Sequence, residues 1–160
     1  MKSSIFETSL QTIHSILIPS EIAMPFIAQN HKRVVVQIRY MDASVRYHAA
    51  LQKRKDQFSI MFSKKYQKAL GVFPNDFFEV QLFEDTSKYG VEMPEELEAV
   101  LESDPEASEI FESFTDGKKR SLIYYVLGFK NPQTRIDKAL IITENIKLGI
   151  QDNRAIIKKI

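Results

Sequence analysis

The spacing of apolar residues changes once along the chain, close to residue 90, and this change limits the possible folds more than any other feature. Before it, apolar and polar residues alternate over 34–40 and 45–51, with shorter runs of the same kind at 58–62 and 78–82. Such alternation predicts strands with one buried face. After residue 90 the apolar residues recur every three or four positions, which predicts helices. The sequence therefore predicts an α+β fold with its strands first.

The β-rich half is expected to form a small barrel. Residues 5–18 predict one long or broken strand, and the polar residues 52–56 predict a solvated connection. Two short helices are expected at 20–27 and 64–70, the second ended by Gly71 in the left-handed conformation. Closing short strands into a barrel removes exposed strand edges, so we expect a barrel of about six strands.

The second half is expected to form a bundle of three to four helices. The first two start signals are Pro94, at a first helical position, and the segment 103–106. Further helices are predicted over 118–129 and 133–148. In the last of them we expect Leu140 to face the core.

These patterns divide the chain into three parts. The most loop-like stretch is 85–90, where small and polar residues gather. We therefore expect a barrel domain at 1–90, a helical subdomain at 91–150 and a basic tail at 151–160.

The formal net charge of +1 is a cancellation between segments. Residues 1–90 carry 12 basic and 8 acidic side chains, whereas 92–116 hold ten carboxylates and no Lys or Arg. This acidic run is usually the solvated face of amphipathic helices. The sharper alternative is a surface that attracts a cationic peptide or protein. The near-neutral total argues against a protein that binds nucleic acid over its whole surface.

The residue inventory predicts a protein that is not an enzyme and has no cofactor. The chain has no Cys, which excludes disulfides, thiolate metal sites and cysteine nucleophiles. Its five Gly are too far apart for a phosphate-binding loop. His14, His31 and His48 have no histidine partner at helical spacing, so no metal site is expected, and His48 should face solvent. No catalytic residue is therefore assigned.

Two groups of side chains remain as candidate binding residues. The first is a ligand site around the third and fourth predicted helices: Tyr124, Lys130, Thr134 and Arg135. The second is a nucleic-acid patch on a short helix: Lys64, Lys65 and Lys68.

Arg135 carries the argument for the first group. A cation in the first turn of a helix is disfavoured by the helix dipole, so it indicates a specific partner. That partner is either a carboxylate such as Glu112 or a ligand anion. For the lysine patch, the alternative is an ordinary exposed helix face.

No segment approaches the roughly 20 apolar residues that span a bilayer, so no membrane span is expected. The N-terminal stretch also lacks the continuous apolar run of a signal peptide, because Glu7, Gln11 and His14 interrupt it. A cytoplasmic location is therefore expected.

The C-terminal part resembles a known family. The segments 93–101, 104–107 and 130–136, with Phe111, are similar to the bacteriocin-protection, YdeI-like or OmpD-associated (OmdA) helical domain. The segments 63–71 and 75–80 resemble the small β-barrel domain of unknown function that often precedes it. That barrel also looks like the double-split barrel of swapped-hairpin transcription factors. The family-like turn is usually Gly-Asp, whereas this chain has Asn75-Asp76, and Asn tolerates a positive φ.

The resemblance implies a bacterial protein with a barrel followed by helices and no established catalytic activity. It implies a role in protection against bacteriocins or antimicrobial peptides, carried out by a binding or stress-protection module. The alternative function is nucleic-acid binding or regulation through the basic face of the barrel.

Overall fold

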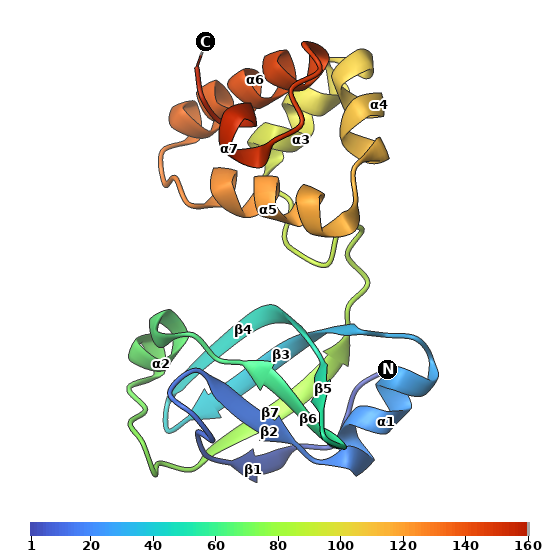
Figure 1. Cartoon of the computed structure of the whole chain (residues 1–160). Coiled ribbons are helices and arrows are strands. Elements are labelled where there is room, and N and C mark those ends of the chain that lie inside the picture. The colour runs from blue at the N-terminus through green and yellow to red at the C-terminus, as the bar shows by residue number, and fades with distance from the viewer. Residues whose placement is uncertain (160) are drawn as a thin grey trace. The chain divides into compact units, whose positions relative to one another are not determined.

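The computed structural model is an α+β protein and describes residues 1–159. Position 160, the last residue of the predicted tail, lies outside the described residues. The chain divides into two compact units, Met1–Thr86 and a second that begins at Ser87 (Figure 1). We call them the β unit and the helical unit. No helix of the described part is long and apolar enough to cross a membrane.

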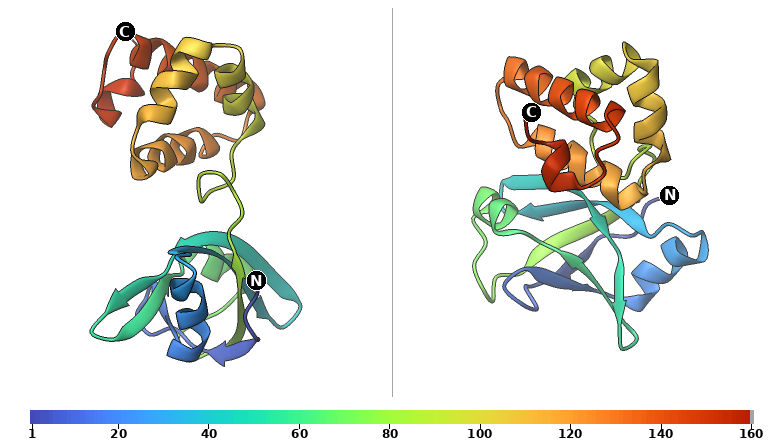
Figure 2. Two further views of the ribbon diagram at one scale, coloured as in Figure 1. Left: turned by 90° about the vertical axis from the view of Figure 1, so that its right-hand side faces the viewer. Right: turned by 45° about the horizontal axis from the view of Figure 1, so that its top comes forward.

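The β unit contains seven strands in two antiparallel sheets (Figures 1 and 2). The four-stranded sheet has the order β1-β7-β3-β4, and the three-stranded sheet has the order β2-β6-β5. The strands are β1 (Phe6–Thr8), β2 (Ser15–Ile18), β3 (Arg33–Tyr40), β4 (Ala43–Ala50), β5 (Gln52–Arg54), β6 (Gln57–Met61) and β7 (Phe78–Glu84).

The predicted alternation is confirmed in the central strand β3. Val34, Val36 and Ile38 are fully buried, and the residues between them are more exposed. Inward-facing residues of both sheets share one hydrophobic core with Phe62 and Phe78, whose rings meet edge to face with centroids 5.4 Å apart. The β unit is therefore held together by apolar contacts between its two sheets.

The predicted closed barrel is not found among the described residues, and the strands number seven where about six were expected. Residues 52–56 are exposed, as the predicted solvated connection requires, but Gln52–Arg54 form the edge strand β5 where a connection was expected. Segment 5–18 breaks into β1 and β2, which pair with different sheets. A polar edge strand lacks the buried face that alternation detects, so the pattern did not reveal it.

Two short helices complete the β unit: α1 (Ser20–Ala28) and α2 (Lys64–Leu70). Gly71 ends α2 with a φ of +77°, as the sequence predicts. Asn75 adopts a φ of +75°, so the turn before β7 keeps the left-handed geometry with Asn in place of Gly.

The helical unit consists of five helices around a second, separate core (Figure 2). They are α3 (Glu95–Glu102), α4 (Pro105–Ser113), α5 (Asp116–Leu127), α6 (Pro132–Lys147) and α7 (Asn153–Ile156). The first four correspond to the predicted helices. Side-chain caps fix three of their starts, since Asp104, Thr115 and Asn131 each accept a hydrogen bond from a backbone N–H of the first turn.

The predicted inward position of Leu140 is wrong, since its side chain is 47% exposed. Helix α6 buries Ala139, Ile142, Thr143 and Ile146. Ile136 is partly buried and packs against the same core. Apolar residues lie on more than one face of α6, so packing against the other helices, and not the sequence of α6 alone, determines which face is buried.

The predicted basic tail contains a helix that is anchored to α6. The side chain of Ile156 in α7 is fully buried, and the Asn145 side chain donates to the Ile156 and Lys158 carbonyl oxygens at 2.7 Å each. One buried amide therefore satisfies the end of a four-residue helix that could not persist alone.

We expect Asn145→Ala to release this segment. The substitution removes two buried hydrogen bonds, and a buried group left without its partner costs about 1–3 kcal/mol. The free energy of unfolding in urea should fall by about that amount, and limited proteolysis should cut within 150–159. The exposed Gln151→Ala variant is the control and should match the parent in both measurements. Unchanged stability and resistance to proteolysis in Asn145→Ala would show that apolar packing alone holds α7.

Candidate functional site

The ten carboxylates of the acidic run form two groups in the structure. Four take part in ion pairs inside the helical unit: Glu96, Asp104, Glu112 and Asp116. The other six are exposed and have no ion pair or side-chain hydrogen bond with a described residue: Glu92, Glu95, Glu98, Glu102, Glu106 and Glu109. We call these six residues the acidic surface.

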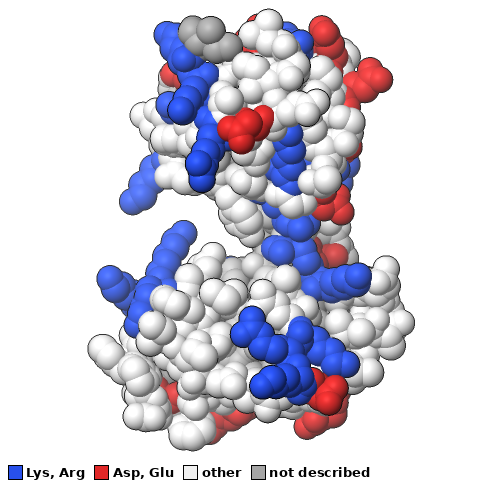
Figure 3. All heavy atoms as spheres, in the orientation of Figure 1, with Lys and Arg blue, Asp and Glu red and all other residues white. Residues whose placement is uncertain are grey.

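Helical spacing places the members of the acidic surface close to one another. On α3, Glu95, Glu98 and Glu102 follow each other at three and four residues and therefore share one face. Glu106 and Glu109 have the same relation on α4, which packs against α3. Red side chains gather on the α4 side of this unit in Figure 3. Like charges at this spacing repel by about 0.2–0.5 kcal/mol per pair, so the surface is stable despite its charge pattern.

Glu102 is placed where a helix tolerates a carboxylate least. It is the last residue of α3, and the last turn of α3 has no basic residue. The carbonyl end of a helix carries a partial negative charge, which adds to the repulsion from Glu98. Helix stability therefore does not explain a glutamate at this position.

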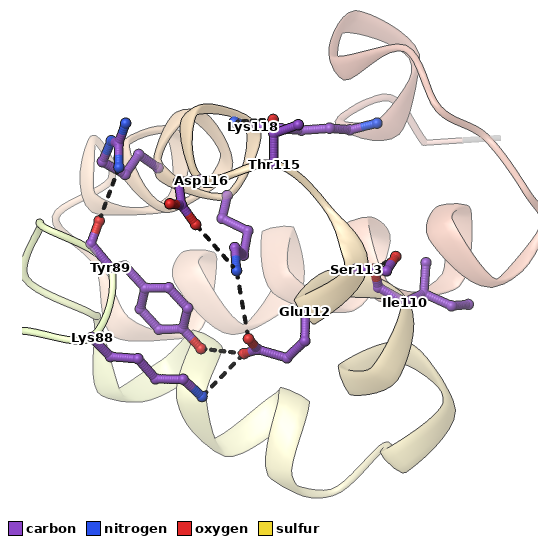
Figure 4. Close-up of polar contacts among 10 residues, drawn as sticks. Lys88, Tyr89, Ile110, Glu112, Ser113, Thr115, Asp116 and Lys118 are labelled. Carbon is purple, nitrogen blue, oxygen red and sulfur yellow. Dashed lines mark hydrogen bonds and ion pairs between the residues drawn. The ribbon is translucent and has the colours of Figure 1, made fainter.

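Glu112 belongs instead to a closed network (Figure 4). The Tyr89 hydroxyl donates to Glu112 Oε1 at 2.5 Å, and Lys88 Nζ lies 3.2 Å from the same oxygen. Lys119 Nζ bridges Glu112 and Asp116, at 3.6 Å from each carboxylate. The network joins the segment before α3 to the end of α4 and the start of α5.

The network shifts the pKa values of Glu112 and Tyr89 in directions that favour their bonded forms. The hydrogen bond from Tyr89 lowers the pKa of Glu112, with a further contribution from Lys88. Burial, and then the bond to Glu112, raises the pKa of Tyr89. The contribution of Glu112 to stability is therefore lost as the pH falls through its lowered pKa. That of Tyr89 is lost as the pH rises through its raised pKa.

The partner of Arg135 is Glu96 rather than Glu112. Its Nη1 lies 3.7 Å from Glu96 Oε2, and Nε donates to the Phe129 carbonyl oxygen at 2.5 Å. Nη2 donates to the Leu127 carbonyl oxygen at 3.3 Å. Glu96 is 9% exposed, and Glu112 is already bound to other groups. The guanidinium thus joins α3 to the end of α5. The sequence analysis left its partner open between a carboxylate and a ligand anion, and the structure shows a carboxylate.

The other three members of the predicted ligand group lie around the loop between α5 and α6. Tyr124 is half exposed on α5, and Lys130 is exposed in the loop. The Thr134 backbone N–H donates to Asn131 Oδ1, which fixes the start of α6. The four residues are thus placed on adjoining elements, and their role in binding stays a prediction.

The predicted nucleic-acid patch lies on α2. Lys64, Lys65 and Lys68 are all exposed, and α2 contains no carboxylate. Lys65 Nζ lies 5.6 Å from the centre of the Tyr66 ring. Binding of nucleic acid by this patch also stays a prediction.

The prediction that His48 faces solvent is wrong. Its Nδ1 lies 2.8 Å from Asp85 Oδ2, and the two side chains are 23% and 4% exposed. The sequence placed Asp85 in a loop, and no local signal shows that the end of β7 reaches β4. Within residues 1–159 no group of three or more His, Asp or Glu side chains is arranged to hold a metal ion.

A family of known proteins matches most of the helical unit. Residues 90–149 match the OmdA family, described as bacteriocin-protection, YdeI or OmpD-associated. The match covers the segment from just before α3 to the end of α6 and so contains all six residues of the acidic surface and the Glu96–Arg135 pair. The β unit lies outside the OmdA match.

Two further comparisons add no functional information. No curated protein sequence matches the chain. The solution structure of PHS018 from Pyrococcus horikoshii is similar over 52% of this chain and 96% of its own, with 18% identity and a TM-score of 0.42.

The Glu96–Arg135 pair should be a structural element of the helical unit. Arg135→Met leaves a buried carboxylate without its cation, and we expect the free energy of unfolding to fall by about 3 kcal/mol. The double variant Glu96→Leu/Arg135→Met should recover part of this loss, because no buried charge remains. The exposed Lys130→Met variant is the control, with a change within about 0.5 kcal/mol. If the two single losses simply add in the double variant, the pair does not interact.

Proposed function

We propose that the protein is a non-enzymatic binding module that protects a bacterial cell by binding cationic antimicrobial peptides on the acidic surface of its OmdA domain. The observation that carries the proposal is the set of six exposed carboxylates that form no ion pair with any residue in 1–159. Folding gains nothing from their repulsion, whereas a cationic ligand would relieve it.

The geometry supports binding of an extended chain of cations. Glu95, Glu98 and Glu102 form a row along α3, and Glu106 and Glu109 continue the negative surface on α4. Each exposed ion pair contributes only about 0–1 kcal/mol, so affinity requires several contacts at once. The field of the whole surface also accelerates the encounter with a cationic partner.

The match to the OmdA family supports the proposed role in protection against antimicrobial peptides. The family description names bacteriocin protection, and the matched segment contains all six residues of the acidic surface.

The alternative is nucleic-acid binding through Lys64, Lys65 and Lys68 on α2. The specific observation in its favour is three exposed cations on a helix without carboxylates. It differs from the first proposal in the sign of the ligand and in the unit that binds it, so one assay distinguishes them.

The test is a titration of the full chain with a fluorescently labelled deca-lysine peptide. We expect binding at 20 mM NaCl that weakens steeply by 300 mM, because screening shortens the range of surface charges. The triple variant Glu98→Lys/Glu102→Lys/Glu109→Lys should lower the affinity by at least about tenfold, which is about 1.4 kcal/mol. The free energy of unfolding of the same variant should stay within about 0.5 kcal/mol of the parent's, since the loss of like-charge repulsion offsets the cost of a cation in the first turn of α3.

The matched control places the same change of charge in the β unit. Glu7, Glu21 and Glu79 are exposed there, and the triple Lys variant should keep the parent affinity within about twofold. Equal weakening by both triple variants would reduce the effect to net charge and overturn the proposal. Absence of peptide binding, with retention of a labelled DNA duplex that Lys64→Gln/Lys65→Gln/Lys68→Gln abolishes, would favour the alternative.

A further inference from the structure

The three-stranded sheet of the β unit has a hollow outer face. Strands β2 and β6 bury Ile16, Ile18, Phe58 and Ile60 on their inner face, as part of the hydrophobic core. The outer face of the same strands lines a groove of about 740 Å³, which also extends along β5. This volume lies within the range of roughly 300–1,000 Å³ that is typical of sites for small molecules.

The strand register builds the floor of the groove from polar residues. Leu17 of β2, Ser59 of β6 and Gln52 of β5 form one row across the sheet. Arg54 lies opposite Gln57 in the next row on the same face. Because alternate residues of a strand share a face, these rows place a hydroxyl, two amides and a guanidinium over one surface.

One rim of the groove is a cationic hairpin. Lys53, Arg54 and Lys55 follow one another along β5 and into its turn, and all three are exposed. The turn consists of Lys55 and Asp56, with φ values of +50° and +64°. Two-residue turns of this kind favour Asn and Gly, so a lysine at the first position has a conformational cost. Blue side chains gather over this part of the β unit in Figure 3.

The groove contains cations and hydrogen-bonding groups without a carboxylate. Its ionisable lining residues are His14, Lys53, Arg54 and Lys55, and none of them has an ion pair with a described residue. On the opposite rim, the Thr12 and Ser15 hydroxyls are hydrogen-bonded to each other at 2.7 Å. Both retain free bonding capacity, because a hydroxyl offers one donor and two lone pairs.

We propose that this groove binds a small phosphorylated ligand that carries hydroxyl groups, of the phosphorylated-ribose class. The cations of the hairpin match phosphate oxygens, since hydrogen bonds from charged donors are the strong ones. The floor and the opposite rim match hydroxyl groups. This site goes beyond the proposed function, because it lies in the β unit and takes a ligand of the opposite charge.

The lining also argues for a small molecule and against a single-stranded nucleic acid. Proteins that bind single strands combine a cationic groove with aromatic side chains on which bases stack. None of the groove's lining residues is Phe, Tyr or Trp, and its apolar members are Leu17 and Met61. The imidazole of His14 is the one ring of the lining, so the groove offers no series of rings for successive bases and fits phosphate and sugar better than a strand.

The test is isothermal titration of the full chain with ribose 5-phosphate at low salt. We expect saturable binding, at least tenfold weaker binding of inorganic phosphate, and none of ribose at the same concentrations. Adenosine monophosphate distinguishes the two sources of the ligand: tighter binding than ribose 5-phosphate assigns a nucleotide, and equal or weaker binding assigns a free sugar phosphate.

Two sets of variants locate the site. Lys53→Gln/Arg54→Gln/Lys55→Gln should weaken binding of ribose 5-phosphate at least tenfold. The control Lys64→Gln/Lys65→Gln/Lys68→Gln removes three exposed cations from α2 and should leave the affinity within twofold. Ser59→Ala should weaken binding of ribose 5-phosphate more than that of inorganic phosphate, which a general electrostatic effect would not produce.

Three outcomes would overturn the proposal. They are no binding of ribose 5-phosphate at millimolar concentration, equal affinities for it and inorganic phosphate, and binding of a 12-nucleotide DNA strand in the absence of any binding of the monomers. A failed peptide titration would leave these results unchanged, so the two proposals fail separately.

Discussion

Burial of apolar side chains is the constraint on which the rest of the structure depends, because the chain has no Cys and hence no disulfide to hold it. Each unit contains its own cluster of buried residues, around Phe62 and Phe78 in one and Phe111 in the other. A strand buries every second side chain and a helix buries one stripe of side chains. Burial of these residues therefore also determines which side chains face solvent. The charged residues occupy the remaining faces.

The charged residues fall into two groups: those that form ion pairs within a unit and stabilise it, and those that form none and are candidates for binding a ligand. Glu96, Asp104 and Glu112 are bound by cations and connect segments of the helical unit. Asp104 does so twice, since it caps α4 and lies 2.8 Å from Lys147 Nζ, and these bonds lower its pKa. The carboxylates of the acidic surface and the cations of the β5 hairpin have no such partners, which is the reason both are proposed as binding surfaces.

The sequence predicted what depends on local pattern and missed what depends on distant pairing. The turns at Gly71 and Asn75 and the helices α3 to α6 follow from backbone preferences and periodicity, and the structure contains them. Strand β5 and the partner of Arg135 were missed, because each is fixed by an element that no short segment specifies. The sequence shows the run of ten carboxylates at 92–116, but only the structure shows which four of them form ion pairs and which six make up the acidic surface. The groove could not be predicted from the sequence, because its lining depends on the register of three strands.

The central claim is that the two units present opposite charges to two different ligands, and one measurement addresses it directly. Backbone amide shifts of the full ¹⁵N-labelled chain can be recorded during titration with deca-lysine and, separately, with ribose 5-phosphate. The account predicts that the peptide perturbs residues 92–109, and that the sugar phosphate perturbs 11–17 and 52–61. Perturbation of one common set of residues by both ligands, or of neither segment, would contradict it.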